Sequence, residues 1–123
     1  MGEAPVRILV VEDEKPLAKA LSLKLTTAGF AVSVAYDGQE AVGLLASEQF
    51  GLMILDLIMP RMDGFGVLAW LQQQGKQIKV IVLTNLGQGE DINKIKDMGV
   101  TDYFVKANIS LGELVDHIKK ITS

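Results

Sequence analysis

The sequence predicts an α/β fold: a doubly wound three-layer sandwich around a five-stranded parallel sheet, with strand order 2-1-3-4-5. Short apolar runs alternate with helix-like segments about five times along the chain. Continuous runs of this kind are typical of parallel strands that are buried on both faces. The runs near 7–11, 51–55 and 79–83 are the most apolar and are expected at the centre of the sheet, whereas the run near 31–35 alternates with small residues and resembles an edge strand.

Helix signals follow each of the first two predicted strands. Pro16 suits the first turn of a helix, and Gly29 is a natural stop for that helix. Asp37, with Glu40 three residues later, predicts a capping box that opens the second helix. The apolar residues expected to face inward from these two helices are Leu17, Leu21, Leu25, Ala28, Ala41, Leu44 and Leu45.

The second half of the chain continues the same alternation. We expect helices near 64–74 and 89–97, a strand near 102–105, and a last helix opened by a capping box of Ser110 and Glu113. Gly99 is expected to end the fourth helix, whose inward-facing residues are Ile92 and Ile95. The inward-facing residues of the fifth helix are expected to be Leu114, Ile118 and Ile121.

Length and composition exclude several classes of protein. A chain of 123 residues is one domain, residues 1–123, and can bury a sizeable core. A net charge of −3 gives no electrostatic footprint for nucleic acid, and the absence of cysteine excludes disulfides and thiolate chemistry. No apolar stretch approaches the roughly 20 residues that span a bilayer, and residues 1–5 lack a signal-peptide pattern. We therefore expect a cytoplasmic protein with no direct contact to nucleic acid or membrane.

Charged residues follow several of the predicted strands at the point where each strand ends. Glu12 and Asp13 follow the first strand, Asp56 follows the third, and Lys106 follows the fifth. The carboxyl ends of parallel strands share one edge of the sheet, where ligands of open α/β folds bind. Oxygen-rich, highly charged pockets suit Mg²⁺, which completes its coordination with water and phosphate oxygens. The sequence therefore predicts a site for a divalent cation and a phosphoryl group.

The loop after the third strand carries the sharpest local signal, an Asp-x-x-Met-Pro-x-x-Asp-Gly pattern over residues 56–64. With Glu12-Asp13, Thr84 after the fourth strand, and Tyr103 and Lys106 in and after the fifth, the chain resembles the receiver domain of two-component response regulators over essentially its whole length. That family has a flavodoxin-like fold, which agrees with the strand order predicted above.

The resemblance implies a chemical role for each residue of the pattern. Asp56 would be the phosphoacceptor and would attack a phosphohistidine or a small acyl phosphate. Glu12, Asp13 and Asp56 would hold Mg²⁺ together with the backbone carbonyl of Ile58. Lys106 would pair with a phosphoryl oxygen, and with Asp56 before phosphorylation.

The resemblance also implies a switch and its partners. Thr84 and Tyr103 would rearrange on phosphorylation, with the fourth helix, fifth strand and fifth helix as the surface that reports the change. The phosphoryl donor would be a histidine kinase or a histidine phosphotransfer protein. The receiver would act on a downstream protein or a tethered output domain absent from this chain, with a phosphorylation-dependent dimer as a further option. It would be no enzyme apart from catalysing its own phosphorylation and dephosphorylation.

Three positions depart from the usual family pattern. Lys106 is followed by Ala107 where the family commonly has proline after a cis bond, and a cis bond before a non-proline residue costs roughly 2.5–4 kcal/mol. The sequence leaves open whether this bond is cis or trans. Asn85 is larger than usual, which predicts slower phosphoryl exchange, and the apolar Ile58 and Leu86 predict a long-lived phosphorylated state.

Three other classes of protein fit the sequence less well. A flavodoxin-like protein would need a Ser/Thr- and Gly-rich phosphate loop after the first strand, where this chain has Glu12-Asp13-Glu14-Lys15, which would repel the phosphate of FMN unless a metal intervened. A Mg²⁺-dependent phosphohydrolase would need a substrate-binding cap, and a degenerate receiver would not need its intact acids. The single histidine, His117, is interpreted as part of a solvated helix face, and Trp70 as core packing or a contact patch on the third helix.

Overall fold

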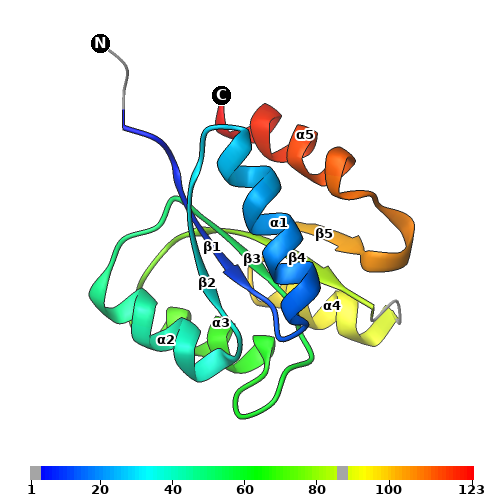
Figure 1. Cartoon of the computed structure of the whole chain (residues 1–123). Coiled ribbons are helices and arrows are strands. Elements are labelled where there is room, and N and C mark those ends of the chain that lie inside the picture. The colour runs from blue at the N-terminus through cyan, green and yellow to red at the C-terminus, as the bar shows by residue number, and fades with distance from the viewer. Residues whose placement is uncertain (1–3, 86–88) are drawn as a thin grey trace.

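The computed structural model describes residues 4–85 and 89–123 and shows a five-stranded parallel sheet in the order β2-β1-β3-β4-β5 (Figure 1). The strands are β1 (Arg7–Val11), β2 (Ala31–Ala35), β3 (Leu52–Leu55), β4 (Lys79–Thr84) and β5 (Asp102–Val105). The helices are α1 (Lys15–Thr27), α2 (Gly38–Ser47), α3 (Gly64–Gln73), α4 (Gly89–Asp97) and α5 (Leu111–Thr122), with a short 3₁₀ turn, η1 (Lys106–Asn108). The predicted fold class and strand order are confirmed.

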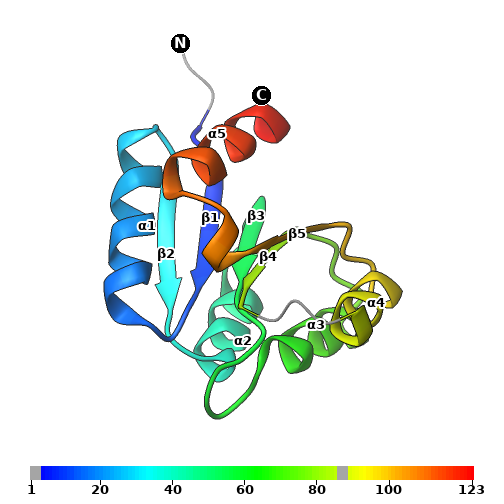
Figure 2. The same ribbon diagram turned by 90° about the vertical axis from the view of Figure 1, so that its right-hand side faces the viewer.

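The alternation of side chains along each buried strand creates two separate cores. On β1, Leu9 and Val11 pack into one core, and Ile8 and Val10 pack into the other. Helices α2, α3 and α4 cover the first core, and α1 and α5 cover the second (Figures 1 and 2). Successive side chains of a strand face opposite sides of the sheet, so a strand covered on both sides must be apolar at every position. This explains why β1, β3 and β4 appear in the sequence as continuous apolar runs.

The predicted helix boundaries are mostly correct, and the caps explain them. Gly29 has a φ of +102°, which suits the turn that ends α1. Ser110 and Glu113 form the predicted capping box at α5. Asp37 caps α2 through the N–H of Glu40, but the Glu40 carboxylate accepts from the N–H of Tyr36 instead of closing the box on Asp37. The capping box predicted at α2 is therefore only half formed.

Several other details differ from the sequence-based expectation. Thr84 belongs to β4 instead of following it, because β4 pairs with β5 up to the Thr84–Val105 position. Ile121 is 37% exposed near the end of α5, whereas Leu114 and Ile118 are buried as expected. Within the described residues, no helix is both long and apolar enough to cross a membrane.

Candidate functional site

The predicted charged residues meet at the carboxyl edge of the sheet. β1 and β3 pair in register up to Val11 and Leu55, and the N–H of Asp56 then donates to the carbonyl of Val11 over 3.0 Å. The N–H of Glu12 donates to the carbonyl of Ala35 at the end of β2, also over 3.0 Å. These two bonds extend the ladder past the strand ends and set the acids of both loops side by side.

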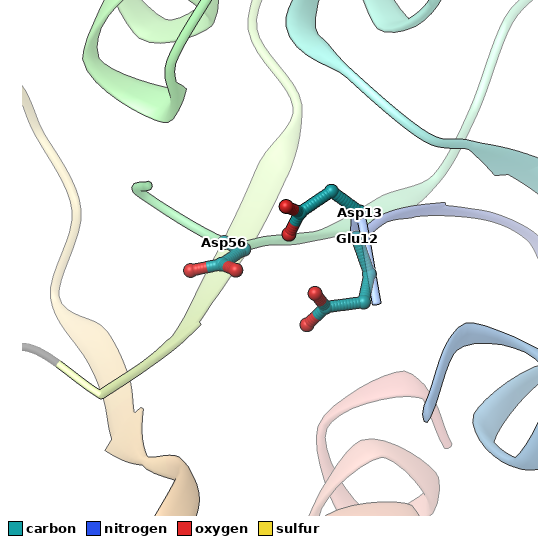
Figure 3. A group of neighbouring side chains, drawn as sticks. All are labelled: Glu12, Asp13 and Asp56. Atoms are coloured by element: carbon teal, nitrogen blue, oxygen red, sulfur yellow. The ribbon is translucent and has the colours of Figure 1, made fainter. Parts of the chain in front are cut away.

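Three carboxylates converge at this edge. Glu12, Asp13 and Asp56 each offer an oxygen that lies within 4.8 Å of the other two (Figure 3). Glu12 is 3% exposed and Asp56 is 5% exposed, while Asp13 lies on the more open side of the group. A set of three oxygen donors with high negative charge matches the preference of a hard divalent cation. The residues present can therefore hold a metal ion.

Lys106 lies between two of the buried acids. Its Nζ is 2.7 Å from Glu12 Oε1 and 3.0 Å from Asp56 Oδ2, and a third carboxylate oxygen, Glu14 Oε2, lies 3.3 Å away. Burial alone would lower the pKa of the Lys106 ammonium, but its hydrogen bonds to Glu12 and Asp56 outweigh that effect and raise the pKa. The lysine is therefore a fixed positive charge at the centre of the site.

Glu12 is the acid most affected by its surroundings. Burial raises the pKa of its carboxyl to about 7, against the opposing hydrogen bonds from Lys106 and from the N–H of Glu14. The nearby charge of Asp56 adds to the increase. Burial, and to a smaller extent the neighbouring acid, thus disfavours a full set of negative charges at this site, and an additional cation would relieve that cost.

The loop after β3 is folded tightly around Asp56. The N–H of Ile58 donates to Asp56 Oδ1 over 3.3 Å, and the N–H of Gly64 donates to the carbonyl of Leu57 over 2.9 Å. A Cβ on Gly64 would lie 2.5 Å from the carbonyl oxygen of Asp56, so this close approach requires glycine. The Ile58 side chain is 60% exposed beside the site.

A cavity of about 340 Å³ opens onto Asp56. Its lining consists of Asp13, Glu14, Asp56, Ile58, Thr84, Asn85 and Lys106. Another hollow, of about 360 Å³, lies between the end of α3, the start of β4 and the segment after α4, and no acidic residue lines it. The cavity at Asp56 is therefore the one with the chemistry expected from the sequence.

The other predicted site residues lie around the same edge. Thr84 is buried at the end of β4, and Tyr103 is half-buried and packs against the core under α2, α3 and α4. The described residues contain no cis peptide bond, so Lys106 reaches the acids from a trans bond to Ala107. Asn85 lines the cavity, while Leu86 lies outside the described residues.

The interpretation of His117 as a solvated residue is wrong. Its Nε2 lies 3.2 Å from Asp102 Oδ2, and its ring meets that of Phe104 edge-on with centroids 5.1 Å apart. Both partners belong to β5. The sequence alone does not show that β5 lies beside this turn of α5. Trp70 and Phe65 are half-buried against the core, in agreement with the packing interpretation.

Sequence reasoning missed two contacts at the edge of the site. Glu14 was not predicted to contact Lys106, although it follows the acid pair directly and its carboxylate reaches that lysine. Asp37 was interpreted only as a helix cap, yet it is nearly completely buried and also binds Arg61 from the loop after β3. The unbroken run of acids over 12–14 could have indicated the first contact, whereas nothing in the sequence pairs Asp37 with Arg61.

The chain forms a doubly wound parallel sheet whose carboxyl edge carries a lysine and an acidic pocket that could hold a metal ion. These are the features expected of the receiver-domain class that the sequence resembles. The sequence model described as "Response regulator receiver domain" matches residues 8–119. Response regulator MprA of Mycolicibacterium vanbaalenii is 35% identical over 117 residues, which cover 95% of this chain and 50% of that protein. The chain thus spans about half the length of such curated relatives.

Solved structures agree with this match. The receiver domain of a Francisella response regulator has a TM-score of 0.85 and 30% identity, with 96% of this chain and 99% of that chain covered. Thermotoga maritima response regulator TrrA, in complex with Mg²⁺-BeF, has a TM-score of 0.80 and 30% identity, covering 94% and 98%. The chain belongs to the response regulator receiver domain family.

Proposed function

We propose that this receiver domain is a phosphorylation-dependent switch with Asp56 as the phosphoacceptor. The observation that carries the proposal is the position of Asp56: a buried carboxylate that opens onto a cavity, beside two further acids and a lysine. In the transfer, an Asp56 carboxylate oxygen forms a bond to phosphorus, and the bond from phosphorus to the donor's imidazole nitrogen or acyl oxygen breaks. The donor would be a histidine kinase, a histidine phosphotransfer protein or a small acyl phosphate.

Glu12, Asp13 and Asp56, with the backbone carbonyl of Ile58, are the residues that would hold Mg²⁺. When bound, the ion supplies positive charge to the phosphoryl oxygens during transfer. Lys106 already donates to Asp56 and is positioned to bind a phosphoryl oxygen once Asp56 Oδ2 no longer accepts from it. The complex of TrrA with Mg²⁺-BeF supports this assignment by analogy.

Thr84 and Tyr103 are the proposed switch residues. Thr84 lines the same cavity as Asp56, and Tyr103 lies on β5, the strand that pairs with the one that carries Thr84. A shift of these side chains would alter the surface of α4, β5 and α5, and with it the binding of a downstream protein, an output domain or a second copy. We place this activity in the cytoplasm, without direct nucleic-acid or membrane binding and without catalysis beyond the domain's own phosphorylation and dephosphorylation.

The test is intact-mass measurement after incubation with acetyl phosphate and Mg²⁺. We expect the mass of one phosphoryl group to be added, to require Mg²⁺, and to be absent from Asp56→Asn. Asp63→Asn is the matched control, because Asp63 caps α3 nearby and asparagine caps a helix as well as aspartate does. Absence of labelling in the wild type, with no binding of beryllofluoride, would contradict the proposal and favour a phosphorylation-independent binding module.

A further inference from the structure

Asp37 forms an unusual ion pair with the loop that follows Asp56. It is 1% exposed, and its two oxygens have different partners: Oδ1 accepts from the N–H of Glu40, and Oδ2 accepts from Arg61 Nε over 2.8 Å and from a second guanidinium nitrogen. Capping α2 needs only the first of these bonds. Asp37 Oδ2 therefore binds the loop after β3 and takes no part in capping α2.

Arg61 has an unfavourable backbone conformation. Its φ of +67° is the only positive value at a non-glycine residue in the described part of the chain. A side chain in the left-handed region is held there only when its surroundings compensate for the strain. Two guanidinium nitrogens of Arg61 donate to the same buried carboxylate oxygen, and this charged contact compensates for the strain, because hydrogen bonds between ionised groups are stronger than neutral ones.

A second bond lies directly beside the ion pair. The N–H of Gly38 donates to the carbonyl of Met62 over 2.9 Å, and a Cβ on Gly38 would lie 2.1 Å from that oxygen. The tip of the loop is thus fastened to two consecutive residues, Asp37 and Gly38. Two residues earlier, the carbonyl of Ala35 accepts from the N–H of Glu12.

The segment 35–38 therefore holds both halves of the metal site. One end binds the backbone of Glu12, and the other binds the loop that carries Ile58. We propose that Asp37 is a positioning residue for the cation: its pair with Arg61 keeps the 57–63 loop in register with the strand end that carries Glu12 and Asp13. This inference rests on the proposed function insofar as a divalent cation must bind at these acids.

The hydrogen bonds from the Glu40 N–H and from Arg61 hold the pKa of Asp37 below its usual value, so the pair is charged at neutral pH. The decisive variants separate the cap from the pair. Asp37→Asn keeps an oxygen for the cap but removes the charge. Arg61→Gly removes the guanidinium and relieves the strain of the positive φ. Arg7→Gln is the control, since Arg7 forms an ion pair with Glu48 beyond the other end of α2.

The experiment measures the Mg²⁺ dissociation constant of the full unphosphorylated chain by titration calorimetry, with thermal unfolding and amide chemical shifts alongside. Mutation of a residue that orients the ligands of a metal ion typically changes the affinity for that ion by about 10-fold or more. We expect Asp37→Asn and Arg61→Gly each to weaken Mg²⁺ binding by about 10-fold and to shift the amides of 57–62, with no further loss in the double variant because both remove the same contact. Arg7→Gln should leave the affinity unchanged.

Unchanged Mg²⁺ affinity in both single variants, with only a lower melting temperature, would overturn the inference and leave the pair a purely structural contact. A wild-type chain that does not bind Mg²⁺ would overturn both this inference and the proposed function. If Mg²⁺ binds and the variants weaken it while acetyl phosphate adds no mass, the inference stands and only the proposed phosphorylation fails.

Discussion

Lys106 Nζ lies closer to Glu12 Oε1, at 2.7 Å, than to Asp56 Oδ2, at 3.0 Å. The lysine is thus shared between the proposed phosphoacceptor and a proposed metal ligand. Both carboxylates are almost fully buried, so neither can replace the ammonium with bulk water. Lys106 therefore balances the charge of the site before any phosphoryl group arrives.

Replacing Lys106 with methionine should destabilise the metal-free protein. The change leaves two buried carboxylates without their cation, and breaking a buried ion pair by removing one partner costs about 3 kcal/mol or more. We expect urea unfolding in EDTA to show that loss and Mg²⁺ to recover part of it, because the ion neutralises the same acids.

Lys79→Met provides the control for this comparison. Its ion pair with Asp102 spans 3.4 Å and is more exposed to solvent, and pairs of that kind contribute about 1 kcal/mol or less. Equal losses of stability in the two variants would show that Lys106 is no more important than a surface lysine.

The phosphorylated state should be long-lived, with Ile58 as one reason. If Ile58 has the place that this position has in the family, it would lie on the path of the water that attacks the proposed aspartyl phosphate, and its largely exposed apolar side chain would not orient that water by hydrogen bonding. We expect the phosphoryl mass to persist well beyond seconds without a phosphatase and Ile58→Asn to shorten its lifetime. Leu23→Asn, at an exposed leucine on α1, should have no effect. Loss of the label from the wild type within seconds would contradict the prediction.

Most of the fold could be predicted because burial determines both the strands and their order. β1, β3 and β4 are covered on both faces and carry continuous apolar runs, whereas β2 and β5 are only partly buried, as edge strands are. The acids of the site could be predicted because parallel strands bring their carboxyl ends to one edge.

The missed contacts depend on geometry that a local pattern does not carry. Asp37 and Arg61 are 24 residues apart, and the left-handed backbone of Arg61 would suggest glycine or asparagine there. His117 lies beside two lysines in sequence but contacts Asp102 and Phe104 on a strand 13 or more residues earlier. Neither pairing is visible until the elements are packed.

Replacing Asn85 with alanine should speed phosphorylation by small donors. Asn85 lines the cavity over Asp56, and a smaller side chain widens the approach to the carboxylate. The measurement is the initial rate of labelling by acetyl phosphate at saturating Mg²⁺, with Gln73→Ala on α3 as a control that removes an exposed amide outside the cavity. Identical rates for wild type and Asn85→Ala would show that this side chain does not limit access.

Asp37 should also make stability depend on pH in the acid range. Its folded-state pKa lies below the usual value, so the unfolded chain binds the proton more tightly than the folded chain does. The stability that the ionised carboxylate contributes is therefore fully present above about pH 5, and it is lost as the pH falls past the unfolded-state pKa of about 4 and through the lower folded-state pKa. Urea unfolding at pH 6, 4 and 3 should give the wild type a higher free energy of unfolding than Asp37→Asn at pH 6. This difference between the two proteins should become smaller by pH 3. A gap that stays constant across this range would mean that the charge of Asp37 adds nothing to its role as a cap.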